Sequence, residues 1–221
     1  MDNIQERLIK LCNNFHAARE FQIQISKRMS FADAKDPIRT IAGLDSSYKQ
    51  QKIISAVVVY DIISNKIVEK HVAEAEKPCE YRSTFLFLRE VPSFLEVIDL
   101  LKKKPDCFLV DGHGIAHPYY AGSATVFGVL VDSPTIGIAK RPLKDFKIVK
   151  ISKKYAQIYV KNKFVGVAVY TTSMIKPIYI SPGNKITITK SIEIIRSLLK
   201  PSVKLPVPLW LAHRLATFGQ L

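Results

Sequence analysis

Residues 107–117 read CFLVDGHGIAH, an apolar run that passes into a polar segment with two glycines. The apolar part is typical of a short buried strand, and it delivers Asp111 to the end of that strand. Open α/β sheets bind their ligands at this edge. Gly112 and Gly114 have no side chain, so a ligand or another backbone segment can approach them closely. An ordinary polar turn is the alternative interpretation of the same residues.

The segments on either side of this strand predict a mixed sheet. Apolar spacing and turn residues divide the chain into a helical region over 1–36, strands over 39–44, 53–60 and 66–73, a helix over 83–104, the strand ending at 111, a helix over 118–132, a strand over 135–139, a hairpin over 156–160 and 164–170, and helices over 187–200 and 208–218. Ser83 is the expected N-cap of one helix and Pro118 the expected start of the next.

Three strands followed by alternating helix and strand are typical of the ribonuclease H-like fold. We therefore expect an α/β protein in which a three-stranded antiparallel meander and parallel strands form one mixed sheet flanked by helices. A length of 221 residues suits one domain over 1–221 with a substantial core.

Composition indicates a protein that works inside the cell and outside the membrane. The chain is 48% hydrophobic and 24% charged, and no apolar run approaches the roughly 20 residues that span a bilayer. Residues 1–10 lack the apolar core of a secretory signal. The three cysteines are scattered and form no Cys-x-x-Cys pair, which fits a reducing compartment. We expect a cytoplasmic monomer.

Charge is the strongest global indication of a partner. Lys and Arg number 33 against 19 Asp and Glu, so the formal net charge is +14. Such a field favours a polyanion, and nucleic acid is the natural candidate. A generally Lys-rich surface is the alternative, and an anionic membrane is disfavoured because no segment forms a clean basic amphipathic helix.

Three carboxylates stand out by their predicted positions. Asp45 is expected to end the first strand, as Asp111 ends another, and Glu90 lies on the helix between them. If they converge at one edge of the sheet, their hard oxygen ligands suit Mg²⁺ or Mn²⁺. A metal held in this way supports phosphodiester hydrolysis. A turn cap for Asp45 and a surface ion pair for Glu90 are the alternatives.

Two further side chains are candidates for the same site. Lys140 follows the strand over 135–139 and would contact a phosphate or position water. His213, on the last helix, is a candidate metal ligand or proton carrier near neutral pH. A solvated loop cation and a structural histidine are the corresponding alternatives.

Taken together, these segments resemble the endonuclease V family of DNA-repair nucleases. The resemblance runs from about residue 40 to about residue 215. The matching segments are IAGLD at 41–45, FLRE at 87–90, DGHGIAHP at 111–118, PTIGIAK at 134–140, SPG at 181–183 and LAH at 211–213. The third and fourth of these segments form a highly specific pair at this spacing.

The resemblance implies Mg²⁺-dependent hydrolysis, with Mn²⁺ as a possible substitute, of a phosphodiester on the 3′ side of deoxyinosine, leaving a 5′-phosphate. It implies that Asp45, Glu90 and Asp111 hold the metal, and that Lys140 and His213 complete the catalytic site. The implied partner is DNA that contains deoxyinosine, in double- or single-stranded form.

The resemblance also implies a wedge that enters the gap left by the lesion base. Tyr81 takes the position of the family's wedge tyrosine. The two prolines that flank this tyrosine in the family are replaced by Glu80 and Ser83. Aromatic stacking remains available, at about 1–3 kcal/mol per base, but the loop loses the rigidity of its prolines.

The base pocket is expected to be lined by Thr84, Leu86 and Gly112, with Gly112 and His117 also near the nucleic acid. Several residues depart from the family pattern. These are Thr84 in place of a glycine, Tyr119 and Tyr120 in place of basic residues, Asn184 in place of a histidine and Trp210 in place of an arginine. They fall on the surface expected to contact substrate, and none removes a catalytic group.

Two other functions remain open from the residues alone. One is an endoribonuclease specific for inosine in RNA, which would recognise the 2′-hydroxyl. The other is a lesion-binding protein without turnover, although a pure binder has no need of a metal centre.

Overall fold

The computed structural model describes residues 2–32, 37–170, 176–201 and 203–221. Its helices and strands, in chain order, are α1 (Asp2–Leu11), α2 (Phe15–Arg28), β1 (Thr40–Lys49), β2 (Lys52–Asp61), β3 (Lys66–Glu76), α3 (Leu86–Asp99), β4 (Cys107–Asp111), α4 (Ser123–Leu130), β5 (Thr135–Ala139), β6 (Lys147–Lys150), β7 (Tyr155–Val160), β8 (Lys163–Val169), β9 (Ile178–Asn184), α5 (Ile188–Leu198) and α6 (Val207–Phe218).

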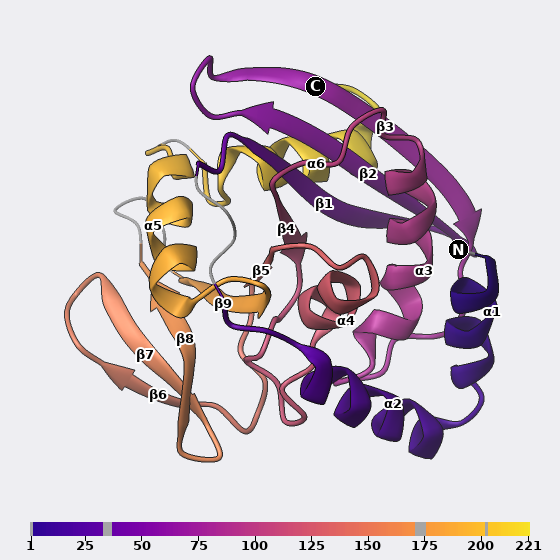
Figure 1. Ribbon diagram of the computed structural model, residues 1–221, viewed down its shortest axis with the longest axis horizontal. Coiled ribbons are helices and arrows are strands. Elements are labelled where there is room, and N and C mark those ends of the chain that lie inside the picture. The colour runs from indigo at the N-terminus through magenta and orange to yellow at the C-terminus, as the bar shows by residue number, and fades with distance from the viewer. Residues whose placement is uncertain (1, 33–36, 171–175, 202) are drawn as a thin grey trace.

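One nine-stranded sheet runs through the molecule in the order β3-β2-β1-β4-β5-β9-β8-β7-β6 (Figure 1). β1, β2 and β3 form an antiparallel meander, and β1, β4 and β5 are parallel neighbours. β9 and the β6–β8 strands extend the sheet in antiparallel fashion. The α/β mixed sheet expected from the sequence is therefore confirmed.

Side-chain alternation along the central strands divides the core into two layers. Ala42 and Leu44 of β1 face a cluster that contains residues of α1, α2, α3 and α4. Ile41 of β1 and Leu109 of β4 face the opposite cluster, which α5 and α6 cover. Successive side chains of a strand point to opposite faces, so an apolar run such as 107–110 supplies both layers at once.

β1 is longer than predicted, and this changes the position of Asp45. β1 pairs with β2 from Thr40 to Lys49, whereas its pairing with the parallel strand β4 stops at Leu44. The sequence predicted Asp45 at the end of this strand. In the structure Asp45 lies inside β1. It is nevertheless the first β1 residue beyond the paired part of β4, so its parallel side is open.

The helical region predicted over 1–36 is interrupted, and residues 33–36 lie outside the described residues. α1 and α2 are separated near Asn14, whose side-chain oxygen accepts a hydrogen bond from the Ala17 N–H at 3.0 Å. Capping of this kind satisfies a free N–H group at the start of a helix. It therefore favours a new helix start at this point.

Two predicted helix starts are wrong. α3 begins at Leu86 without a side-chain cap, so Ser83 is not its N-cap. α4 begins at Ser123, because the chain from Pro118 onward is still part of a loop. That loop is closed on itself by the Gly122 N–H to Gly114 O bond at 3.0 Å. It is held against β9 by the Ile115 N–H to Pro182 O bond at 2.8 Å.

Two strands were not predicted. β6 lies in a stretch interpreted as a basic loop, and all four of its residues are exposed. β9 contains Pro182 and Gly183, which are unfavourable in strands. Pro182 is tolerated because the pairing of β8 with β9 ends at Ile180, so its missing N–H leaves no gap in a ladder on that side.

Within the described ranges, no helix is both long enough and apolar enough to cross a membrane.

Close backbone contact holds α6 against β1. A Cβ atom at Gly43 would lie 2.2 Å from the carbonyl oxygen of Pro208, which is inside the contact distance of any real side chain. Gly43 therefore lets α6 rest directly on the strand that carries Asp45.

Gly43→Ala is expected to lower the free energy of unfolding by about 1–3 kcal/mol, because α6 must shift to make room for the methyl group. Urea denaturation followed by circular dichroism measures the change. Val68→Ala, at an exposed position of β3, is the control and should stay within about 0.5 kcal/mol of the parent. An equally stable Gly43→Ala variant would contradict the close contact.

Candidate active site

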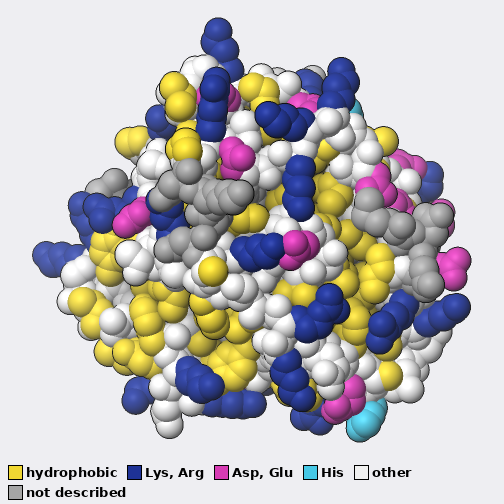
Figure 2. All heavy atoms as spheres, in the orientation of Figure 1, with side chains coloured by type: hydrophobic (Ala, Val, Ile, Leu, Met, Phe, Trp, Pro, Cys, Tyr) yellow, Lys and Arg dark blue, Asp and Glu magenta, His cyan; other side chains and the backbone are white. Residues whose placement is uncertain are grey.

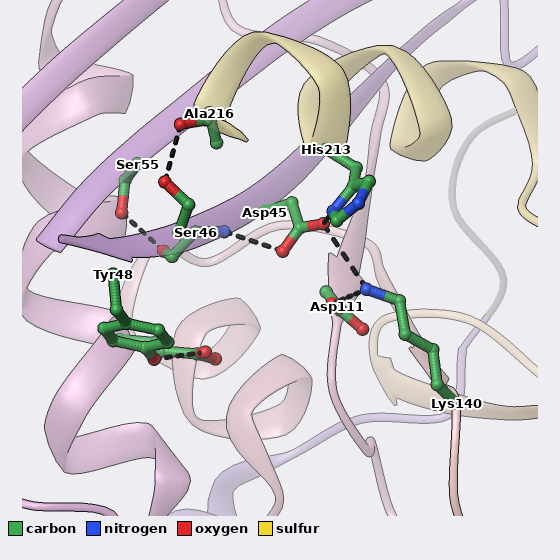
Figure 3. Close-up of polar contacts among 10 residues, drawn as sticks. Asp45, Ser46, Tyr48, Ser55, Asp111, Lys140, His213 and Ala216 are labelled. Carbon is green, nitrogen blue, oxygen red and sulfur yellow. Dashed lines mark hydrogen bonds and ion pairs between the residues drawn. The ribbon is translucent and has the colours of Figure 1, made fainter. Parts of the chain in front are cut away.

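Sheet register brings the two aspartates together. β1 and β4 pair in parallel up to Leu44 and Val110, so the next residues, Asp45 and Asp111, are neighbours. Asp111 in turn pairs with Ile138 of β5, two residues before Lys140. Three adjacent strands therefore present two carboxylates and one ammonium group at the same edge, as Figure 3 shows.

Lys140 and His213 bind these carboxylates directly (Figure 3). The Lys140 Nζ atom lies 2.5 Å from Asp111 Oδ2 and 3.6 Å from Asp45 Oδ2. His213 Nδ1 lies 2.8 Å from Asp45 Oδ2, and the Ser46 N–H donates to Asp45 Oδ1 at 2.7 Å. Asp45 is thus held from both of its oxygens, and only 2% of its surface is exposed.

Glu90 approaches from the other face of the sheet, on α3. Its Oε1 atom accepts a hydrogen bond from the Tyr48 hydroxyl at 2.7 Å, and its buried Oε2 atom has no partner among the described residues. The Arg89 guanidinium lies 3.7 Å above the Tyr48 ring. Tyr48 therefore fixes one oxygen of Glu90 and leaves the other available.

A chain of hydroxyl groups anchors α3 to the strands beside Glu90. The Ser93 hydroxyl donates to Ser55 Oγ at 2.8 Å, and Ser55 Oγ lies 2.6 Å from Ser46 Oγ. Ser93 follows Glu90 by three residues and so shares its helix face. This contact fixes the position of α3, and therefore of Glu90, relative to β1 and β2.

Two of these carboxylates, Asp111 and Glu90, hold their protons more tightly than usual. Burial, followed by the charge of Asp45, raises the pKa of Asp111 to about 7. Burial, followed by the charge of Asp111, raises the pKa of Glu90 well above its usual range. Burial disfavours the charged form of Lys140, yet Asp111 and Asp45 raise its pKa overall. The site therefore carries an excess of negative charge that a cation would relieve.

His213 responds to the same carboxylates. Its hydrogen bond to Asp45 raises the pKa of the imidazole above 6.5. Because Nδ1 is engaged with Asp45, the Nε2 atom is the one left for a proton or a water molecule. An imidazole of this kind suits proton transfer near neutral pH.

The donor set fits a hard divalent cation. Asp111 and Glu90 line one cavity, Asp45 lies beside Asp111, and Glu90 Oε2 is a buried oxygen without a partner in the described chain. As they stand, no three His, Cys, Asp or Glu side chains of the described residues form a complete metal site. In Figure 3 the Lys140 ammonium contacts both aspartates. Mg²⁺ needs only one or two carboxylates and retains water, so the set is sufficient.

A cavity of about 360 Å³ opens beside the carboxylates. Asp111, Glu90 and Lys140 are part of its wall. The sequence-predicted residues that also line it are Tyr81, Thr84, Leu86, Gly112 and His117. Asp45 and His213 do not line the cavity. Asp45 contacts Lys140 of the cavity wall, and His213 is hydrogen-bonded to Asp45. Tyr81 is 60% exposed, so its ring is free to contact a ligand that enters.

Two lining residues have unusual backbone angles. Gly112 has φ +141°, a conformation that side chains rarely adopt, so the glycine is required there. Thr84 has φ +71°, which costs a β-branched residue energy. The family that the sequence resembles has a glycine at this position, and glycine adopts such an angle without strain.

His117 binds inside the protein with both ring nitrogens. Its Nε2 atom lies 3.0 Å from the carbonyl oxygen of Thr84, and its Nδ1 atom accepts a hydrogen bond from the Tyr119 N–H at 3.2 Å. Burial lowers the pKa of His117 to about 3, so the ring is neutral at physiological pH. It joins the loop after β4 to the loop before α3, and its proximity to phosphate stays a prediction.

Sequence reasoning missed Tyr48. Its position three residues after Asp45 places it on the opposite face of β1, which is the face of α3. The alternation of β1 side chains was therefore a usable signal, but the bond to Glu90 depends on how high α3 sits, and no local pattern encodes that.

Comparisons with known proteins identify the family of this chain. A sequence model of the endonuclease V family matches residues 21–214. The endonuclease V of Thermofilum pendens is 36% identical over 214 residues, which cover 96% of this chain and 92% of the relative. The crystal structure of the Bacillus subtilis endonuclease V is 32% identical, covers 90% of this chain and 91% of that one, and superposes with a TM-score of 0.82.

A third comparison supports the fold. A Ciona intestinalis endonuclease V, solved in complex with a 24mer DNA containing an inosine followed by a ribo-adenosine, superposes with a TM-score of 0.84. It is 24% identical to this chain and covers 92% of it and 96% of that chain.

Tyr48→Phe is expected to lower the free energy of unfolding by about 1–2 kcal/mol at neutral pH, because Glu90 loses its hydroxyl donor. The ring that carries Arg89 is kept. Tyr60→Phe is the matched control, since it removes a hydroxyl that donates to the neutral Asn65 side chain at 3.2 Å. Urea denaturation compares the two, and an equal or smaller loss for Tyr48→Phe would contradict the special contribution of Glu90.

The pH dependence of stability follows from the raised pKa of Asp111. Between about pH 4 and about pH 7 the folded protein retains a proton that the unfolded chain releases. The free energy of unfolding in EDTA should therefore fall as pH rises through this window. Asp111→Asn removes this titration. The free energy of unfolding of the variant should therefore fall less than that of the wild type between about pH 4 and about pH 7. Parallel pH profiles for the two proteins would refute the assignment.

Proposed function

Because this chain belongs to the endonuclease V family, we propose that it is a Mg²⁺-dependent endonuclease that recognises deoxyinosine in DNA and hydrolyses a phosphodiester on the 3′ side of the lesion, leaving a 5′-phosphate. The observation that carries this proposal is that Asp111, Glu90 and Lys140 line the same cavity as the exposed ring of Tyr81. The Ciona relative was solved with inosine-containing DNA, which agrees with this substrate class.

In this proposal Asp45, Asp111 and Glu90 hold Mg²⁺, or Mn²⁺ in its place. A divalent ion held there lowers the pKa of a water molecule and offsets negative charge on the phosphate. Glu90 contributes Oε2, because its Oε1 atom is occupied by Tyr48. Asp45 contributes an oxygen whose orientation His213 and the Ser46 N–H maintain.

Lys140 and His213 act on the phosphate and the proton. Lys140 exchanges its contact with Asp111 for the negative charge that develops on the scissile phosphate, which a preformed cation stabilises. His213 Nε2 transfers a proton to or from water while Nδ1 stays bound to Asp45. Lys140 thus neutralises charge and His213 transfers the proton, and both side chains stay beside Asp45.

The lesion base enters the cavity after leaving the stack. Thr84, Leu86 and Gly112 line the cavity, and backbone groups at these positions can read the oxygen and ring N–H of hypoxanthine. Tyr81 occupies the gap in the stack. Unstacking costs least for a mispaired base, which favours deaminated adenine over normal bases.

One continuous sheet carries the two aspartates and Lys140, which supports a single domain over 1–221. We also propose a cytoplasmic location, which the free cysteines Cys12, Cys79 and Cys107 support because they suit a reducing compartment.

Asp111→Asn is expected to retain binding of inosine-containing duplex but to reduce nicking by 100-fold or more, since the loss of a metal ligand costs several kcal/mol of transition-state stabilisation. A cleavage panel with and without Mg²⁺, covering inosine, uracil, abasic and mismatch sites in DNA and inosine in RNA, measures it. Nicking in EDTA, or full activity of the variant, would overturn the metal site. Cleavage of the RNA alone would convert the assignment to an endoribonuclease, and binding without any cleavage would leave a lesion-binding protein.

A further inference from the structure

A second concave surface lies next to the lesion cavity and is not part of the site described above. It has a volume of about 450 Å³ and is bounded by one stripe of α2, by the loop that follows His117 and by the β7–β8 turn. The stripe is formed by Arg19, Ile23 and Ser26, which recur at the spacing of one helix face. We call this surface the α2 groove.

The α2 groove continues from the lesion cavity along the chain. His117 lines the cavity, whereas Pro118, Tyr119 and Tyr120 line the groove. Past Ser26 and Tyr120, a further hollow of about 360 Å³ reaches Lys163. Both α2 and the β7–β8 hairpin lie at the lower edge of Figure 1. The residues that line the cavity and the groove are therefore neighbours in the chain, and the groove and the further hollow share Ser26 and Tyr120.

Three cations are held on the tyrosine rings of the groove. Arg19 lies 5.0 Å from the centre of the Tyr119 ring and its Nε–H also donates to the Tyr119 hydroxyl at 2.8 Å. Lys161 lies 5.8 Å from the same ring, and Lys163 lies 5.4 Å from the centre of the Tyr120 ring. Such contacts hold a cation in place while its charge stays exposed.

None of these three cations has a carboxylate within ion-pair distance in the described part of the chain, although Glu20 also lines the groove. Their charge is therefore available to an anion. The face of the molecule in Figure 2 likewise carries more Lys and Arg than Asp and Glu side chains, in keeping with the net charge of +14.

From this arrangement we propose that the α2 groove binds the unpaired nucleic-acid strand adjacent to the lesion, with Arg19, Lys161 and Lys163 on its phosphates and with Tyr119 and Tyr120 as a stacking platform. This inference rests on the proposed function and adds to it a strand-binding site outside the catalytic cavity. Cations that track a backbone beside aromatic rings are the usual means of binding single strands. Tyr119 and Tyr120 hold cations that come from α2 and from the β7–β8 hairpin.

Salt dependence of binding tests the proposal. Wild-type protein in EDTA is titrated with fluorescent oligonucleotides that carry one inosine, either in a short duplex or in that duplex with an unpaired extension on the 5′ or the 3′ side. An extension on one of the two sides should tighten binding and steepen the plot of log K against log salt. Each phosphate contact to a single strand contributes about 0.7 to this slope.

The variant Lys161→Gln/Lys163→Gln removes two of the three cations from exposed positions. It should lose most of the gain from the extension, and its slope should fall by about 1.4. Lys147→Gln/Lys150→Gln removes the same charge from exposed positions of β6, outside the groove, so it lowers the net charge equally. This control should keep both the gain and the slope.

Tyr119→Leu leaves every charge in place and supplies a second test. It should weaken binding of the extended substrate by about tenfold, because a stacking contact is worth about 1–3 kcal/mol. The short duplex lacks the strand that the groove binds, so both groove variants should lose less affinity for it than for the extended substrate.

The proposal is overturned if the groove variants and the β6 control lose equal affinity, or if neither unpaired extension tightens binding to the wild-type protein. Failure of the proposed function would look different, because wild-type protein would then fail to nick any inosine substrate in Mg²⁺ whatever the groove variants do.

Discussion

The contact on which the active site depends is the approach of two carboxylates on adjacent parallel strands. Asp45 and Asp111 are placed side by side by the pairing of β1 with β4, and that pairing is fixed by buried apolar residues on both faces of the sheet. A one-residue slip would move every side chain to the opposite face. The negative charges cannot separate to reduce their repulsion, since each belongs to a backbone held in the core. Burial, and after it the charge of Asp45, accordingly raises the pKa of Asp111.

Lys140 reduces the repulsion between the two aspartates. Its ammonium group contacts both aspartates and comes from the next parallel strand, so the same register that crowds the carboxylates also delivers the counter-charge. One lysine against three carboxylates leaves an excess of negative charge. In addition, a buried oxygen of Glu90 has no partner among the described atoms. A divalent ion bound by the carboxylates would offset this excess of negative charge. It would also free the Lys140 ammonium from Asp111 for contact with a phosphate.

Much of the fold and part of the site could be predicted from the sequence, and the failures have physical causes. The apolar run before Asp111 and the β-branched meander have local patterns, so these strands were predicted within a few residues. The β1 strand was predicted too short because its continuation, Ser46 to Lys49, is polar and is held by pairing with β2 rather than by burial. β9 was missed because a proline and a glycine are acceptable where a neighbouring strand has already ended.

The contacts of Glu90 and of the α2 groove show what lies beyond local pattern. Tyr48 reaches Glu90 across a strand–helix boundary, and Tyr119 gathers Arg19 and Lys161 from segments 100 and 42 positions away. Such contacts depend on how whole elements pack, so no spacing in the sequence encodes them. Asp45 and Asp111 are fixed by sheet register, whereas the proposed strand-binding surface is built from loops and helix faces. The positive charge of that surface comes from α2 and the β7–β8 hairpin, and the rings of Tyr119 and Tyr120 hold it in place.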